Sequence, residues 1–218
     1  MSTPSEKVIG PHRGQPVHVA GEPLQSARAA MILMHGRGAS AEDILTLVPE
    51  LDQSGYAYLA PQAAGYTWYP YSFLAPLSNN EPWLSSALSV IASLLNTIAE
   101  VGIPPERTIL LGFSQGACLS LEFAARNARR YGGLAGLSGG LIGPDSTPRD
   151  YQGSLEATPV FLGCSDVDFH IPKRRVQQSS EVLQRLGGDV TMRLYPGMGH
   201  MVNEDEIQFV RGMMALFK

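Results

Sequence analysis

Residues 112–116 read Gly-Phe-Ser-Gln-Gly, which places Ser114 between two glycines. An apolar run precedes this segment, and small residues that favour a helix follow it from Ala117 onward. This is the context of a nucleophile elbow, a tight strand-to-helix turn that exposes a serine hydroxyl above a helix N-terminus. A serine in that position is predicted to attack a carbonyl carbon, provided that a base takes its proton.

A second segment, residues 136–140, reads Gly-Leu-Ser-Gly-Gly and matches the same pattern, so the pattern alone is weak evidence. The residues that follow separate the two serines. Ser138 is followed by three glycines and a proline up to residue 144, which disfavour a helix, whereas residues 117–130 contain neither type. We therefore take Ser114 as the nucleophile and Ser138 as a turn residue at a strand end.

The expected base is a histidine, and His200 is the best placed of the five in the chain. It ends the segment Pro-Gly-Met-Gly-His at 196–200, whose glycines give this loop the freedom to reach a serine on a neighbouring strand. The other four are worse placed: His12 and His18 precede the core strands, His35 is predicted to brace the turn after the first buried strand, and His170 lies too close in sequence to the candidate acids.

The carboxylate that orients the base must come from Asp166 or Asp168, which both follow the apolar strand expected at 158–163. Spacing does not decide between them, and the other aspartate is predicted to hydrogen-bond its own turn. The order serine, acid, histidine is that of the α/β-hydrolases. Two backbone N–H groups must hold the oxyanion, and we expect them from Gln115, after the nucleophile, and Arg37, after the first buried strand.

The composition limits the class of protein. The chain has 218 residues, 44% of them hydrophobic, with a net charge of -4 and no basic run, which argues against a nucleic-acid partner. Residues 1–10 lack the apolar core of a signal peptide, and no window of 18 residues is wholly apolar, so no membrane span is predicted. Cys118 and Cys164 are predicted to be free buried thiols, which favours the cytoplasm.

The order of the expected elements indicates an α/β fold. Strands and helices alternate, which predicts a mostly parallel sheet flanked by helices on both faces, with ligands beyond the carboxyl ends of the strands. Residues 1–28 form an N-terminal extension in which Val8-Ile9 and residues 17–20 suggest an edge hairpin, and residues 29–218 form the main domain. The expected strands are 29–34, 56–60, 108–113, 131–137, 158–163 and 189–195. The expected helices follow Ser40 and Asn203 as N-caps and cover 84–98, 117–130 and 176–186.

Two loops bear on the ligand. The long loop at 61–80 is rich in aromatic residues, and we expect Tyr66, Trp68, Tyr71 and Phe73 to bind substrate. The alternative is that these aromatic side chains only pack the loop onto the sheet. The loop at 139–157 is too short for a helical cap, so we expect no large cap domain and an open groove.

Four segments together resemble the phospholipase/carboxylesterase family of α/β-hydrolases, which includes the acyl-protein thioesterases. They are Leu-Met-His-Gly at 33–36, Gly-Phe-Ser-Gln-Gly at 112–116, Asp-Phe-His-Ile-Pro at 168–172 and Gly-Met-Gly-His at 197–200. The resemblance implies an α/β-hydrolase fold from about residue 29 to the C-terminus. It places the acid at Asp168, because the family's Asp-Pro-x-Val-Pro ends where Ile171-Pro172 stand, and the oxyanion donors at Arg37 and Gln115.

The sequence departs from this family pattern in three places. Phe169 stands where the family has proline, Arg37 stands where the thioesterases have an apolar residue, and the loop at 68–73 is similar to the bacterial esterase branch. The Arg37 side chain is either a solvated cation or a partner for an acidic substrate group or nearby carboxylate.

The predicted function is that of a serine carboxylesterase acting on small to medium carboxylic esters through an acyl-enzyme, with Ser114, Asp168 and His200 as catalytic residues. Neither a metal nor an organic cofactor is needed for this chemistry. The expected partner is a small-molecule ester, and a homodimer is left open. The alternatives are a lysophospholipase or acyl-protein thioesterase, and a non-catalytic binding protein on a hydrolase scaffold.

Overall fold

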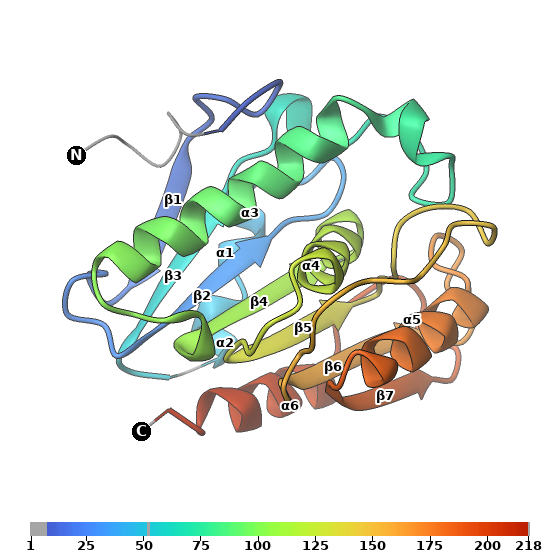
Figure 1. The fold of residues 1–218 in the computed structure, drawn as a ribbon. Helices are drawn as coiled ribbons and strands as arrows, with labels where there is room; N and C mark the ends of the chain where they lie inside the picture. Colours follow the sequence, from blue (N-terminus) through green and yellow to red (C-terminus); the bar gives the residue numbers. More distant parts are fainter. Residues whose placement is uncertain (1–7, 52, 218) are drawn as a thin grey trace.

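The computed structural model describes residues 8–51 and 53–217, in which one seven-stranded sheet forms the centre (Figure 1). The strand order is β1-β3-β2-β4-β5-β6-β7, and every neighbouring pair is parallel except β1 with β3. Residues 1–7, on which part of the signal-peptide prediction rests, lie outside the described residues. The strands are β1 (Val17–Gly21), β2 (Ala29–Met34), β3 (Tyr56–Pro61), β4 (Thr108–Phe113), β5 (Gly133–Leu137), β6 (Pro159–Ser165) and β7 (Asp189–Tyr195).

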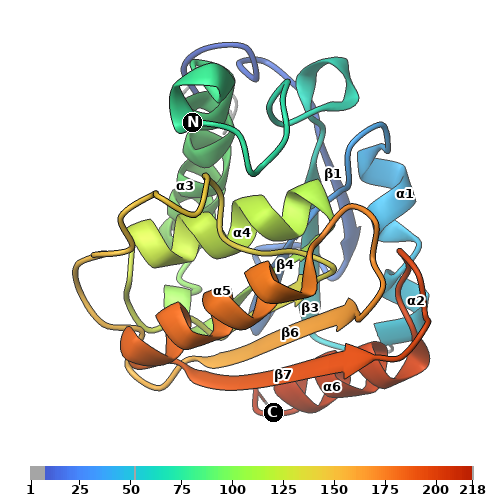
Figure 2. The same cartoon turned by 90° about the vertical axis from the view of Figure 1, so that its right-hand side faces the viewer.

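Helices cover both faces of this sheet, as predicted. One face carries α3 (Trp83–Glu100), α4 (Gln115–Arg126) and α5 (Lys173–Arg185), and the other carries α1 (Ala41–Leu45), α2 (Val48–Leu51) and α6 (Glu204–Met214) (Figure 2). The apolar runs of β2 and β3 are buried on both faces for this reason. Single turns of 3₁₀ helix occur at Ala64–Tyr66, Leu77–Asn80 and Pro105–Arg107.

Two of the predicted helix starts have the expected local chemistry. The Ser40 side chain accepts a hydrogen bond from the Asp43 N–H, and the Asp43 carboxylate accepts one from the Ser40 N–H. Asn203 and Glu206 form the same reciprocal pair at the start of α6. Both predicted N-caps are confirmed. They were predictable because a capping box involves only residues three apart in the chain.

The N-terminal segment differs from the sequence prediction. Val8 and Ile9 are not in a strand, so the expected edge hairpin is not formed. Instead β1 pairs antiparallel with β3, and the Val8 side chain is buried in the core on the side of the sheet that carries α3. The first strand of the sheet therefore comes from the segment that the sequence placed outside the main domain.

Helix α3 is, within the described part of the chain, long and apolar enough to cross a membrane by length and composition alone. Half of its 18 residues are buried, and it packs against β2 and α4. It is thus a core helix of the domain. Within the described residues, the segment between β5 and β6 contains no helix, so no large cap domain covers the carboxyl ends of the strands.

Candidate active site

The turn between β4 and α4 brings Ser114 out of the sheet. Ser114 has φ 55° and ψ -118°, a strained conformation that the surrounding packing maintains. A Cβ atom at Gly112 would overlap the backbone of Gly116, and a Cβ atom at Gly116 would overlap the Met34 carbonyl of β2. Both glycines are required because strand, turn and helix approach one another too closely for any side chain.

Three side chains from different parts of the chain meet at this turn. The Ser114 hydroxyl lies 2.8 Å from His200 Nε2, and His200 Nδ1 lies 2.7 Å from Asp168 Oδ2. Asp168 also accepts hydrogen bonds from the backbone of His170 and Ile171, at 2.8 and 3.0 Å. Burial favours the neutral acid, but the bonds from His200 and the two N–H groups outweigh it and lower the pKa of Asp168.

Asp166, the other candidate acid, has a separate place. Its carboxylate accepts a hydrogen bond from the Gly197 backbone at 2.8 Å, and so ties the loop that carries His200 to the end of β6. The Ser165 hydroxyl accepts another from Gly199 in the same loop, at 3.1 Å. The structure thus brings Asp168 to the imidazole of His200, and Asp166 to the backbone of its loop.

The remaining serine and histidine candidates are not hydrogen-bonded to Ser114 or Asp168 through their side chains in the described part of the chain. Ser138 is fully buried at the end of β5, and its N–H donates to Gly163 in β6. His18 forms an ion pair with Glu42 at 3.2 Å. His170 is exposed, and its ring packs edge-on against that of His200 with 4.8 Å between centroids.

His35 is completely buried and braces the turn after β2, as predicted. Its Nδ1 lies 2.7 Å from the carbonyl oxygen of Gly36, and its Nε2 accepts a hydrogen bond from the Ala63 N–H at 3.1 Å. Because Nε2 is an acceptor, Nδ1 must carry the proton and donate to Gly36. Burial lowers the pKa of His35, which is consistent with a neutral ring.

This hydrogen bond also orients the next peptide. In a trans peptide the C=O and the following N–H point in opposite directions. The Gly36 carbonyl faces the buried imidazole, so the Arg37 N–H points away from that ring. Gly36 and Arg37 line the cleft together with Ser114. The Gln115 N–H belongs to the first turn of α4, where helix N–H groups have no partner within the helix. Gln115 and Arg37, the two predicted oxyanion donors, both line the cleft with Ser114.

The cleft above Ser114 has a volume of about 450 Å³. Its walls include Arg37, Tyr69, Pro70, Tyr71, Phe73 and Phe113. Tyr71 and Phe73 were predicted as substrate-binding residues and do line it, with Tyr71 59% exposed and Phe73 buried. Tyr69 was not singled out from the sequence, although it lies in the same aromatic loop.

The prediction that Trp68 binds substrate is wrong, and the one for Tyr66 stays a prediction. Trp68 is completely buried between the rings of His12 and His35, and its indole N–H donates to the His35 carbonyl at 2.9 Å. Tyr66 is exposed outside the cleft lining, and its carbonyl accepts a hydrogen bond from Gly38. For Trp68 the alternative holds, because its side chain packs the loop against the turn after β2.

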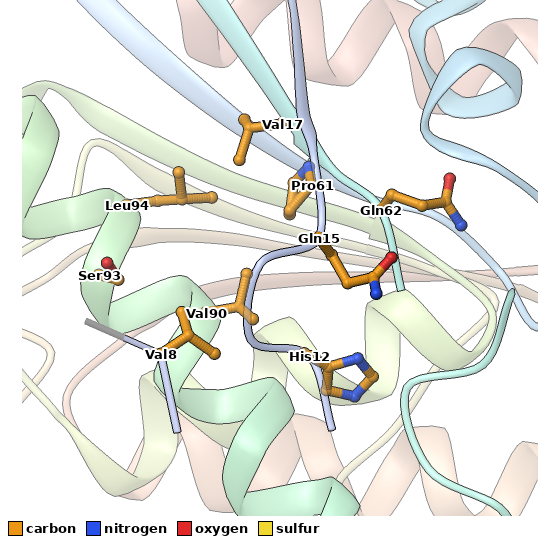
Figure 3. A pocket seen from close by; sticks show the side chains of 9 residues that line it. All are labelled: Val8, His12, Gln15, Val17, Pro61, Gln62, Val90, Ser93 and Leu94. Carbon is orange, nitrogen blue, oxygen red and sulfur yellow. The ribbon is translucent and has the colours of Figure 1, made fainter. Parts of the chain in front are cut away.

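His12 has a structural role that no pattern in the sequence indicates. Its Nε2 lies 2.9 Å from the Trp68 carbonyl and its Nδ1 accepts a hydrogen bond from the Ala64 N–H, so the buried ring holds the aromatic loop from the N-terminal side. Burial lowers the pKa of His12. Figure 3 shows the ring beside Gln15. Both residues line a gap of about 10 Å³, which is room for about one water molecule.

Comparison with known proteins agrees with this geometry. The model of the Phospholipase/Carboxylesterase family matches residues 17–217. The chain belongs to this family. The match includes β1, and it bears out the family resemblance and the predicted α/β-hydrolase fold. As a member of this family, the protein is an ester hydrolase. The particular ester is proposed below.

The chain is similar to relatives and solved structures of the phospholipase/carboxylesterase family, over different fractions of their lengths. The crystal structure of a phospholipase/carboxylesterase from Dyadobacter fermentans is 42% identical, with a TM-score of 0.89 over 93% of this chain and 97% of the other. An acyl-protein thioesterase 1 of Debaryomyces hansenii is 29% identical over 83% of this chain and 88% of its own. One from Gibberella zeae is 35% identical, but this chain spans only about half of it, 53%.

Proposed function

We propose that this protein is a serine carboxylesterase that hydrolyses small to medium carboxylic esters through an acyl-enzyme. The observation that carries the proposal is the hydrogen-bonded series from Ser114 through His200 to Asp168 at the floor of the cleft. A serine hydroxyl needs a base, and the base needs an orienting carboxylate, to become a nucleophile near neutral pH.

In the first half of the reaction Ser114 Oγ bonds to the ester carbonyl carbon while its proton moves to His200 Nε2. The carbonyl oxygen becomes an oxyanion, which the N–H groups of Gln115 and Arg37 stabilise. The tetrahedral intermediate then collapses, the bond to the alcohol oxygen breaks, and His200 gives its proton to that oxygen. Asp168 keeps the imidazole in the right tautomer and stabilises its charged form.

In the second half a water molecule takes the place of the alcohol. It loses a proton to His200 and attacks the acyl carbon, and the second tetrahedral intermediate releases the carboxylic acid as Ser114 regains its proton. The open cleft of about 450 Å³ with aromatic walls favours small to medium esters. The same residues perform both halves, so a single base is sufficient.

A second candidate function has one specific observation in its favour. Val167, Phe169 and Met201 flank the acid and the histidine in sequence, and all three are exposed, Phe169 to 94%. An exposed apolar rim beside an active site suits an amphiphilic substrate such as a lysophospholipid or an acylated protein. Acyl-length profiling separates the two candidates, because a rate that peaks beyond twelve carbons favours this second one.

We further propose a cytoplasmic enzyme, since Cys118 and Cys164 are both free and buried. Burial raises the pKa of each thiol to about 12, so neither is a reactive nucleophile. A homodimer stays a prediction that sedimentation analysis would test.

The experiment that tests the proposed function is intact-mass analysis after treatment with a serine-reactive fluorophosphonate. We expect a single adduct on the wild type and on Ser138→Ala, and none on Ser114→Ala. No adduct on any of the three would favour the non-catalytic binding protein. Ser114→Ala and His200→Ala should each lower kcat by about 10⁴ or more, and by no more when combined, because the two residues act as a unit.

A further inference from the structure

The side chain of Arg37 has a role distinct from that of its backbone. Its guanidinium donates to three successive carbonyl oxygens of the aromatic loop: Tyr69 at 2.9 Å, Pro70 at 2.7 Å and Tyr71 at 2.6 Å. Arg37 is exposed, as a solvated cation would be, but its hydrogen-bond partners are backbone carbonyls, a role that neither interpretation from the sequence included. A planar guanidinium with five donors is suited to such a cluster of acceptors.

The segment that Arg37 holds is a wall of the cleft. Tyr69, Pro70 and Tyr71 line the same cavity as Ser114. The base of this wall is anchored independently, because the Gln115 side chain accepts a hydrogen bond from the Trp68 N–H and donates one to the Tyr69 carbonyl, both at 2.8 Å. The buried side chains of Trp68 and Tyr69 strengthen that anchor.

The tip of the wall depends on Arg37 more than its base does. Pro70 and Tyr71 are exposed, and their carbonyls converge on the guanidinium. The Tyr71 N–H has one further tether, a hydrogen bond of 2.8 Å to the Asn80 side chain. Without the guanidinium, the Pro70 and Tyr71 carbonyls lose their side-chain donor, whereas the Tyr69 carbonyl keeps donors from Thr67 and Gln115. The tip of the wall would therefore be held less firmly than its base.

The chemistry indicates which part of an ester this wall meets. The leaving alcohol must lie against His200, since His200 protonates it, and the neighbours of that ring are Phe113 and His170. The wall at 69–71 lies instead beside Arg37 and Gln115, whose side chains both hold it. Because the alcohol occupies the side of the cleft next to His200, the acyl group must lie on the other side, against the wall at residues 69–71.

We propose that the Arg37 side chain is a specificity-determining group that fixes the wall at residues 69–71 and thereby limits the length of the acyl chain that the cleft accepts. This inference rests on the proposed esterase function. It assigns two tasks to one residue: the backbone N–H holds the oxyanion, and the guanidinium sets the size of the acyl site.

The test uses Arg37→Met, Arg37→Lys and the control Arg174→Met, all of which keep the backbone N–H. Arg174 is a suitable control because it is an arginine on α5 that is 76% exposed. For each protein, kcat/KM is measured on p-nitrophenyl esters with two to twelve acyl carbons and divided by its own value for the acetyl ester, which removes any loss common to all chain lengths.

We expect Arg37→Met to raise the ratio for the decanoyl ester about tenfold over the wild type, the size of effect that one pocket contact has on discrimination. Arg37→Lys should give a smaller rise, because the ammonium keeps the positive charge and three donors but lacks the rigid planar fork of the guanidinium. Arg174→Met should keep the wild-type profile. A profile unchanged within twofold in Arg37→Met would overturn the proposal.

A second measurement does not depend on hydrolysis. Hydrogen–deuterium exchange of peptides covering residues 67–75 should be faster in Arg37→Met than in the wild type, while peptides covering 108–126 are unchanged. Equal exchange at 67–75 would refute the tether itself. Faster exchange together with a wild type that hydrolyses no ester would instead show that the proposed function has failed, and the specificity assignment with it.

Discussion

Replacing His35 by asparagine or by glutamine separates the two hydrogen bonds of its imidazole. The amide nitrogen of asparagine occupies nearly the position of Nδ1, so His35→Asn keeps a donor for the Gly36 carbonyl and loses the acceptor for Ala63. The amide group of glutamine occupies nearly the position of Nε2, so His35→Gln keeps an acceptor for Ala63 and loses the donor. The two bonds are 2.7 and 3.1 Å long in the structure.

The magnitude follows from what the Gly36 carbonyl controls. If its bond to His35 orients the Arg37 N–H toward the oxyanion, then His35→Gln lets this peptide rotate and removes one of two donors. Loss of one oxyanion-hole donor lowers kcat by about 10²–10³-fold, or about 2.7–4 kcal/mol of transition-state stabilisation. We expect that loss in His35→Gln with little change in KM, and a loss of less than about tenfold in His35→Asn.

The order of stability of the two variants should be the reverse of their order of kcat. His35→Asn leaves the Ala63 N–H buried without an acceptor, which costs about 1–3 kcal/mol, and it also removes more volume from a completely buried site. The asparagine variant is therefore expected to be the less stable and the more active of the two. A residue that only packed the turn would not separate activity from stability in this way.

The assay combines kcat and KM on a short-chain ester, the affinity for a trifluoromethyl ketone that forms a tetrahedral adduct on serine, and urea denaturation of each variant. The affinity for the ketone should fall with kcat in His35→Gln, because both depend on the oxyanion donors. Equal kcat in the two variants, or values of kcat that fall in the same order as stability, would refute the reasoning.

Three further predictions concern other parts of the molecule. Asp168→Asn should lower kcat by about 10⁴, and Asp166→Asn by far less, because an amide oxygen still accepts from the histidine loop; a larger loss in Asp166→Asn would exchange their roles. Gly116→Ala should destabilise the fold by about 3 kcal/mol in urea denaturation, since its Cβ would overlap the backbone of β2, whereas the control Gly212→Ala, with open space around its Cβ, should not. Burial raises the pKa of Glu206 from 4.5 to about 7, so the folded state binds this proton more tightly than the unfolded state, and stability falls as pH rises between those values. Between pH 4 and pH 8, the free energy of unfolding of Glu206→Gln should therefore rise by about 3 kcal/mol relative to that of the wild type, at about 1.36 kcal/mol per pKa unit. A difference between the two proteins that does not change with pH would contradict the assignment.

Local sequence was enough to determine the features that depend on neighbouring residues. The elbow around Ser114 was readable because a strand, a tight turn and a helix start occur within a few residues. The helix caps at Ser40 and Asn203 were readable for the same reason, since each involves a partner three residues away. The alternation of apolar runs indicated the parallel sheet, which brings the carboxyl ends of its strands to one edge.

Tertiary structure decided which distant groups meet. Asp166 and Asp168 both follow β6 closely, and spacing did not decide between them, although the family resemblance placed the acid at Asp168. The fold shows that Asp168 contacts the imidazole of His200 while Asp166 holds its loop. In the aromatic loop, side chains of the same chemical type have opposite roles: Trp68 is buried between two histidines, and Tyr71 faces the cleft.

The same holds for the polar groups that hold this loop. His12 is 56 residues from the Trp68 carbonyl that it contacts, and Arg37 is more than 30 residues from the three carbonyls that it binds. Backbone carbonyls occur at every position, so no residue type in the sequence marks the ones that a distant side chain will reach. The sequence by itself thus determined the kind of chemistry and the residues on the strand ends, and only the packing of the loop against the sheet decided what surrounds them.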